Sequence, residues 1–157
     1  AIGYVNAEYK KTKDLGSDLK RYKEFFPQVE EVKIKPLSEK EMEVDWHLGL
    51  KFGILTVPIW YRHRYTWLDP SVLVYRRIAG DLEFIYGAYE WVPVGDKTLY
   101  FFTAAATVGK HGSTIAKFSE LVPNSHMILG ISSTAIILER QLPWIEGTIG
   151  KSAGKEE

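Results

Sequence analysis

A row of aromatic and imidazole side chains alternates along residues 54–68. Tyr61, His63, Tyr65 and Trp67 are spaced by two, so in a β-strand they lie on one face. Buried faces are usually built from Val, Ile and Leu, whereas Tyr and His carry O–H and N–H groups that need partners when buried. The row therefore predicts either polar tips at a wet rim or a cavity that holds a polar or hydrated molecule.

Two consecutive arginines, Arg76 and Arg77, lie in the next predicted strand. Because side chains alternate along a strand, one of the two must point to the same side as the aromatic row. A guanidinium on a buried face needs a charged or hydrogen-bonding partner. We therefore predict that one of these arginines holds a polar group beside the row, and the sequence leaves open which one.

Three other patterns have simpler explanations. Glu43, Asp45 and His47 share one strand face, but the alternation of a half-exposed strand accounts for them, and we predict no metal site. Residues 147–152 read G-T-I-G-K-S, without the spacing and preceding strand of a phosphate-binding loop. Nothing points to a Ser-His-Asp triad, and the absence of cysteine excludes thiolate chemistry. We expect no cofactor.

Alternation and turn residues predict the strands that carry these side chains. Residues 42–52 alternate apolar with polar, Gly53 marks a hairpin, and 54–68 form the strand of the aromatic row. Pro58 in that strand favours an edge position or a bulge. Further strands are predicted at 1–7, 29–34, 72–79, 82–92 and 99–108. The meander from residue 40 to 108 predicts a strongly curved antiparallel sheet.

Helical spacing is confined to two regions. Residues 8–26 predict two short helices, interrupted at 16–18 and ended by Pro27. Residues 115–138 return to helical spacing, with Met127 and Ile131 in an apolar stripe wide enough to cover a sheet. The fold class is therefore α+β, with one domain over residues 1–146 and a disordered tail over 147–157.

The composition is that of a folded globular chain. Its 157 residues are 45% apolar and 25% charged, which suits one sizeable core. Twenty basic and 20 acidic residues cancel, so no net field attracts nucleic acid or an anionic membrane. No apolar segment reaches the ~20 residues that span a bilayer. We expect a cytoplasmic protein with no nucleic-acid partner and at most transient membrane contact.

The order of elements and two motifs resemble the helix-grip superfamily, which includes START lipid-transfer domains, the birch pollen allergen, polyketide aromatase/cyclases and coenzyme Q-binding proteins. The first motif is carried by Ala7, Leu15, Asp18, Leu19, Arg21-Tyr22 and Glu24-Phe25-Phe26-Pro27. The second is carried by Gly87, Tyr89, Trp91, Pro93, Gly95-Asp96 and Thr98. The resemblance covers about residues 1–145. It implies a curved antiparallel sheet of six to seven strands wrapped on a long C-terminal helix, with two short helices after the first strand.

Two departures concern elements that bound the cavity mouth in this superfamily. Lys10, Lys11 and Lys13 make the first helix unusually polar, and Pro123 and Gly130 interrupt the final helix. The mouth is therefore expected to differ in shape, and the ligands of the superfamily need not carry over.

The resemblance and the aromatic row together predict binding, and transfer, of a hydrophobic small molecule such as a lipid, quinone, isoprenoid or polyketide. The alternative is a polyketide aromatase/cyclase (cyclase/dehydrase) that uses His63, a tyrosine and an arginine in the same cavity. A third class, a regulator that contacts a protein partner, would instead show an exposed apolar patch. The predicted ligand-binding residues are Trp46, Tyr61, His63, Tyr65, Arg76, Arg77, Tyr89, Trp91, Met127 and Ile131.

Overall fold

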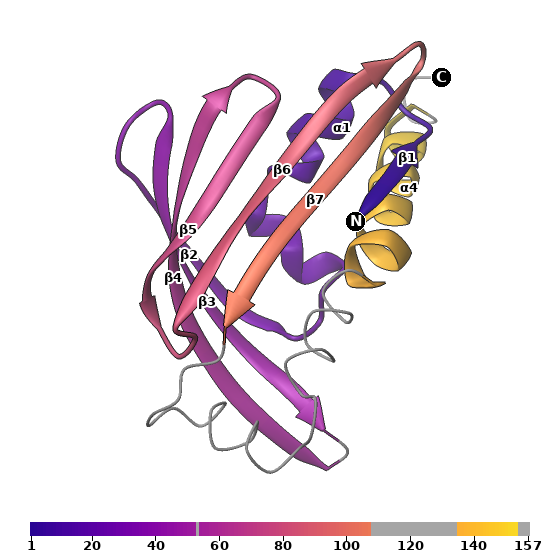
Figure 1. The fold of residues 1–157 in the computed structure, drawn as a ribbon. Helices are drawn as coiled ribbons and strands as arrows, with labels where there is room; N and C mark the ends of the chain where they lie inside the picture. Colours follow the sequence, from indigo (N-terminus) through magenta and orange to yellow (C-terminus); the bar gives the residue numbers. More distant parts are fainter. Residues whose placement is uncertain (53, 108–134, 154–157) are drawn as a thin grey trace.

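The computed structural model describes residues 1–52, 54–107 and 135–153. A seven-stranded antiparallel sheet runs in the order β1-β7-β6-β5-β4-β3-β2. Figure 1 shows that the sheet is curved and that its longest hairpin, β3–β4, extends beyond its neighbours. The strands are β1 (Ile2–Val5), β2 (Val29–Pro36), β3 (Glu41–Phe52), β4 (Leu55–Asp69), β5 (Val72–Gly80), β6 (Phe84–Val94) and β7 (Lys97–Thr107).

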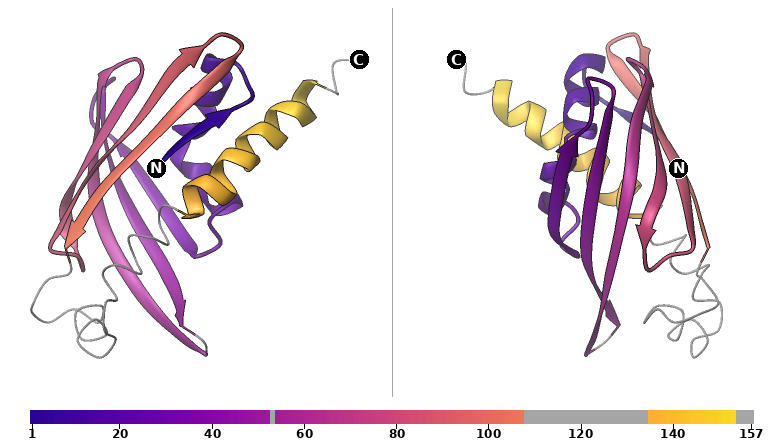
Figure 2. Two further views of the ribbon diagram at one scale, coloured as in Figure 1. Left: turned by 45° about the vertical axis from the view of Figure 1, so that its right-hand side comes forward. Right: turned by 90° about the vertical axis from the view of Figure 1, so that its left-hand side faces the viewer.

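The described helices all lie on one side of the sheet, which we call the inner face (Figure 2). They are α1 (Tyr9–Gly16), the 3-10 helix η1 (Leu19–Glu24), the π-helical turn η2 (Ile137–Gln141) and α4 (Leu142–Ala153). Tyr22 of η1 lies edge-on to Trp46 of β3, with ring centroids 5.3 Å apart. No helix in the described ranges is both long and apolar enough to cross a bilayer.

Two glycines allow the helices to approach the sheet closely. A Cβ on Gly3 of β1 would overlap the side chain of Leu142 at the start of α4. A Cβ on Gly16 at the end of α1 would come within 2.8 Å of the indole nitrogen of Trp91 in β6. These contacts fix the positions of both helices over the inner face.

Most of the predicted architecture is confirmed. The α+β class, the meander and the two short helices after the first strand are present, and the second of these helices is 3-10. Pro58 pairs with Gly49 of β3, but β5 pairs with β4 only from Tyr61 onward. Pro58 therefore lies where β4 has a free edge, so its missing N–H costs no ladder hydrogen bond.

The C-terminal region corrects one expectation. Helix α4 continues through residues 147–153, which were predicted as part of a disordered tail, so the predicted boundary at residue 146 falls inside a helix. The sequence suggested a tail because Gly147 and Gly150 lower helix propensity. Packing of the buried Ile145 onto the core outweighs that preference. The predicted helical residues 115–134, including Met127 and Ile131, lie outside the described residues.

Candidate functional site

Strand β4 places its aromatic row on the inner face. His63 and Tyr65 are buried and Tyr61 is half-buried, whereas Arg62 and Arg64 alternate onto the outer face. The imidazole of His63 stacks on the ring of Tyr61 at 4.6 Å between centroids. This row is the one that alternation predicted. Its polar groups are buried, so they are expected to need hydrogen-bond partners.

Strand β5 adds two residues to this row. In the β4–β5 register Tyr75 lies opposite Tyr65, and Arg77 lies opposite His63. Directly opposed residues of antiparallel strands share a face, so Tyr75 and Arg77 are on the inner face. The ring of Tyr75 stacks on His63 at 5.1 Å, which sandwiches the imidazole between two tyrosines.

The register also answers which arginine lies beside the row. Arg76 lies opposite Arg64 on the outer face and is exposed, so its place among the candidate ligand-binding residues is corrected. A β-bulge follows Arg77, because Arg62 pairs with Ala79 and leaves Ile78 unpaired. Bulges of this kind locally bend a strand and re-aim side chains, and they are common next to functional sites.

His63 is held in its neutral form. Burial, and secondarily the positive charge of Arg77, lower the pKa of His63 from its usual 6.5 to about 3. The side chain is only 4% exposed, and within the described residues neither ring nitrogen has a hydrogen-bond partner. A neutral imidazole offers one donor and one acceptor, and both are available on the inner face.

Arg77 is half-buried beside this imidazole. One terminal nitrogen, Nη2, donates a 2.7 Å hydrogen bond to the backbone oxygen of Gly80. The Nε atom is buried and has no partner within the described residues. The Nε–H of Arg77, which lies opposite His63 in the strand register, is suited to an acceptor such as a carbonyl or an oxyanion.

The surrounding wall is aromatic. Trp46, Tyr89 and Trp91, which the sequence singled out, are buried in the core and contact one another or their neighbours through their rings. Burial raises the pKa values of the inner-face tyrosines Tyr61, Tyr65, Tyr75 and Tyr89, so they remain hydrogen-bond donors at any physiological pH. Gly87 of β6 makes room for Tyr75, because a Cβ there would overlap the Tyr75 ring.

A second buried polar group was missed by sequence reasoning. Gln141, at the end of the π-helical turn, is 0% exposed, and its Oε1 accepts a 3.1 Å hydrogen bond from the hydroxyl of Tyr100. Its Nε2 donates to the hydroxyl of Tyr22 at 3.3 Å. The turn joins η1, β7 and the C-terminal helix through one amide. Tyr75 was also missed, although its spacing of two from Arg77 could have revealed it.

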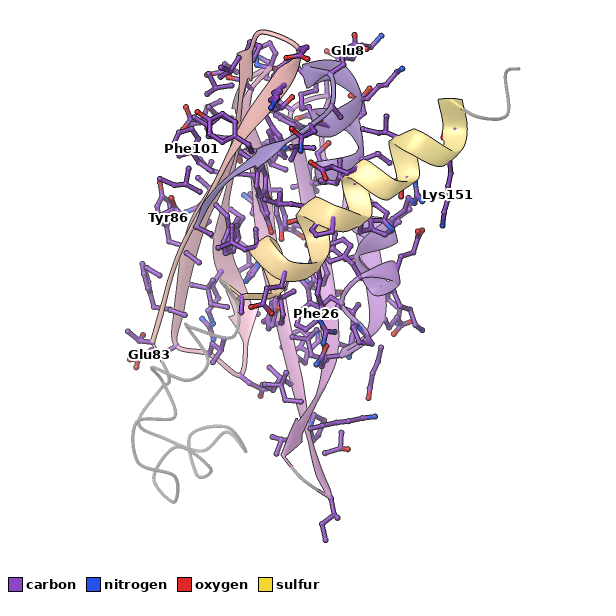
Figure 3. The ribbon with its side chains drawn as sticks, turned by 90° about the vertical axis from the view of Figure 1, so that its right-hand side faces the viewer. Glu8, Phe26, Glu83, Tyr86, Phe101 and Lys151 are labelled. Atoms are coloured by element: carbon purple, nitrogen blue, oxygen red, sulfur yellow. The ribbon has the colours of Figure 1, made fainter. Side chains whose placement is uncertain are left out.

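The remaining predicted patterns have structural partners. Glu43 and Asp45 are ion-paired on the outer face with Arg64 and Arg62, which lowers the pKa of both carboxyl groups. No group of residues in the described part of the chain is arranged to hold a metal ion. Residues 147–152 belong to α4 and are no phosphate loop. Several of them, including Lys151, line a groove together with Arg21 of η1, and Figure 3 shows Lys151 near the C-terminal end of α4.

No protein-family model matches the sequence, and no curated protein matches it. Solved structures are similar in fold. TTHA0849 from Thermus thermophilus superposes with a TM-score of 0.75 at 17% identity, covering 94% of this chain and 96% of that one. The Zhui aromatase/cyclase from Streptomyces sp. R1128 has a TM-score of 0.60 at 19% identity, covering 71% and 68%. Ara h 8.0201 has a TM-score of 0.61 at 12% identity, covering 96% and 95%.

These likenesses, with the observed strand order and helix placement, show that the chain has the helix-grip fold. The resemblance drawn from the two sequence motifs is confirmed at the level of fold. What the fold can do in this chain depends on the residues of the inner face. Those that come together there are Tyr61, His63, Tyr75 and Arg77.

Proposed function

We propose that the protein binds and carries a hydrophobic small molecule against the inner face of its sheet. The observation that carries this proposal is the set of polar groups among aromatic rings on that face. His63 and the Nε atom of Arg77 are buried and lack partners within the described residues. Burying such groups without partners costs free energy, so a purely structural core would not favour them.

The aromatic wall suits an apolar ligand. Binding of the ligand's apolar surface is favoured by about 25 cal/mol per Å², before the entropic cost of association. Rigid rings such as Trp46 and Tyr61 supply this area with little loss of side-chain freedom. Lipids, quinones, isoprenoids and polyketides all offer an apolar body with a few polar atoms. The names of the structurally similar proteins, which include aromatase/cyclases and a norcoclaurine synthase, support ligands of this kind.

A fluorescence titration with N-phenyl-1-naphthylamine, an uncharged apolar dye, tests the proposal. We expect saturable binding to the wild type and about tenfold weaker binding to Tyr61→Ala, which removes a ring next to His63. Tyr86→Ala is the matched control, because Tyr86 lies on the outer face, away from α4 (Figure 3), and is 48% exposed. No saturable binding, or equal losses in both variants, would contradict binding on the inner face.

A second candidate function is ring formation on a polyketide chain. It is favoured by the position of His63 between two tyrosine rings and beside a guanidinium. Arg77 would stabilise the developing enolate, and a neutral imidazole or a tyrosine would move the proton. We expect cyclisation of a poly-β-keto thioester to be lost in His63→Ala and reduced in Tyr65→Phe. Unchanged ring formation in both variants would exclude this role for them.

A further inference from the structure

Arg77 differs from the other half-buried arginines in the described part of the chain. Arg62 is ion-paired with Asp45, Arg64 with Glu43, and Arg21 of η1 with Glu24. For Arg77, which is half-buried, no carboxylate partner is found within the described residues. Its terminal nitrogen is held by the backbone of Gly80, which fixes the direction of the guanidinium.

The distribution of carboxylates along β3 to β6 explains why Arg77 has no acidic partner on these strands. The acidic residues within β3 and β6 occupy outer positions, where they pair with cations or meet solvent: Glu41, Glu43, Asp45 and Glu90. Strand β5 contains no acidic residue, and β4 contains only Asp69 at its exposed end. Arg77 therefore faces the imidazole of His63 and the rings around it. A half-buried cation in such surroundings is stabilised when an anion joins it.

We infer that Arg77 and His63 form a subsite for an oxyanion, so that the ligand is an organic acid with an apolar body and a carboxylate or enolate-type oxygen. This inference rests on the proposed binding function and specifies its ligand class. The Nε–H of Arg77 donates a charge-assisted hydrogen bond to the oxyanion, and the N–H of neutral His63 donates a second. The apolar body then lies along Tyr61 and the neighbouring aromatic rings.

Matched ligand pairs test the subsite. Isothermal titration at pH 7.5 compares decanoate with decanol, and an alkyl nitrophenolate with its methyl ether. The first pair reports on carboxylates and the second on enolate-like oxygens. For the wild type we expect at least one acid to bind about tenfold or more tightly than its neutral partner, as charge-assisted hydrogen bonds imply. Arg77→Met keeps most of the length of the side chain and should abolish that preference while retaining affinity for the neutral partner.

Two further variants control for side effects. Arg76→Met removes the adjacent charge from the outer face and should leave the preference for the acid unchanged. Arg77→Lys keeps the charge without the Nε donor and should retain part of the preference, which keeps the test usable if Arg77→Met does not fold. Circular dichroism melting checks the fold of each variant.

The outcomes separate this inference from the proposed function. If the neutral partners bind but the wild type shows no preference for either acid, the oxyanion subsite is wrong and apolar binding stands. A preference that survives in folded Arg77→Met has the same meaning. If neither the acids nor the neutral partners bind, the proposed function fails and the subsite fails with it.

Discussion

At the scale of single residues, the central pair is His63 and Arg77, which face each other across β4 and β5. Burial and the nearby positive charge of Arg77 both disfavour the charged form of His63. The pair therefore carries one positive charge at neutral pH, on the guanidinium, with a neutral imidazole next to it. That arrangement suits a single bound oxyanion.

The same residue predicts how stability depends on pH. The His63 pKa is about 3 in the folded protein and 6.5 in an unfolded chain, so between these values the unfolded state binds one more proton. The free energy of unfolding should then fall as pH drops from 6.5, by up to about 1.4 kcal/mol per pH unit. In His63→Phe this contribution is absent. The free energy of unfolding, measured by denaturant titration at several pH values between 4 and about 6.5, should therefore change less with pH than in the wild type.

His47→Gln is the control for loss of one histidine, since His47 lies on the opposite face of the sheet from His63. This variant should show the same change of unfolding free energy with pH as the wild type. Parallel pH dependences in the wild type and His63→Phe would mean that His63 is not held neutral by the fold.

At the scale of elements, the strands and the two short helices could be predicted because alternation, turn residues and Pro27 report on local structure. The inner face of β4 followed from the same alternation. The choice between Arg76 and Arg77 could not be made, because it depends on the pairing of β4 with β5 and on the bulge after Arg77. Such pairing is a tertiary property that spacing within one strand does not contain.

The π-helical turn was also beyond sequence reasoning. A π turn adds a residue to the helical turn and so shifts the phase of the side chains that follow. Gln141 at the end of this turn is buried in the core, which the spacing of a regular helix does not predict. The continuation of α4 through residues 147–153 depends on packing of its apolar side against the core rather than on propensity.

The Gln141 network gives a prediction at this scale. Gln141→Leu leaves the buried hydroxyl groups of Tyr22 and Tyr100 without their amide partner, which should lower the free energy of unfolding by about 1–3 kcal/mol. The triple variant with Tyr22→Phe and Tyr100→Phe removes the unpaired groups as well and should recover part of the loss. Urea denaturation measures both effects.

Glu139→Gln, at an exposed position of the same turn, is the control and should change the stability little. If the stability losses of the three substitutions simply add up in the triple variant, the three side chains do not act as one network.

At the scale of the whole molecule, the two faces of the sheet have different roles. The outer face carries ion pairs such as Arg64–Glu43 together with exposed aromatic side chains, among them Phe84 and Tyr86. The inner face collects aromatic rings beneath the helices, with one unpaired imidazole and one guanidinium that has no acidic partner within the described residues. The helix-grip fold thus supplies an aromatic wall beneath the described helices, and β4 and β5 supply the polar groups of the proposed ligand site.

Native mass spectrometry of the protein purified from its natural source shows whether the chain carries an apolar organic acid. We predict a complex heavier than the bare chain, and release on denaturation of an apolar organic acid that negative-ion spectra identify. A chain that keeps its bare mass, both as purified and after exposure to a small-molecule extract of that source, would contradict ligand binding by this protein.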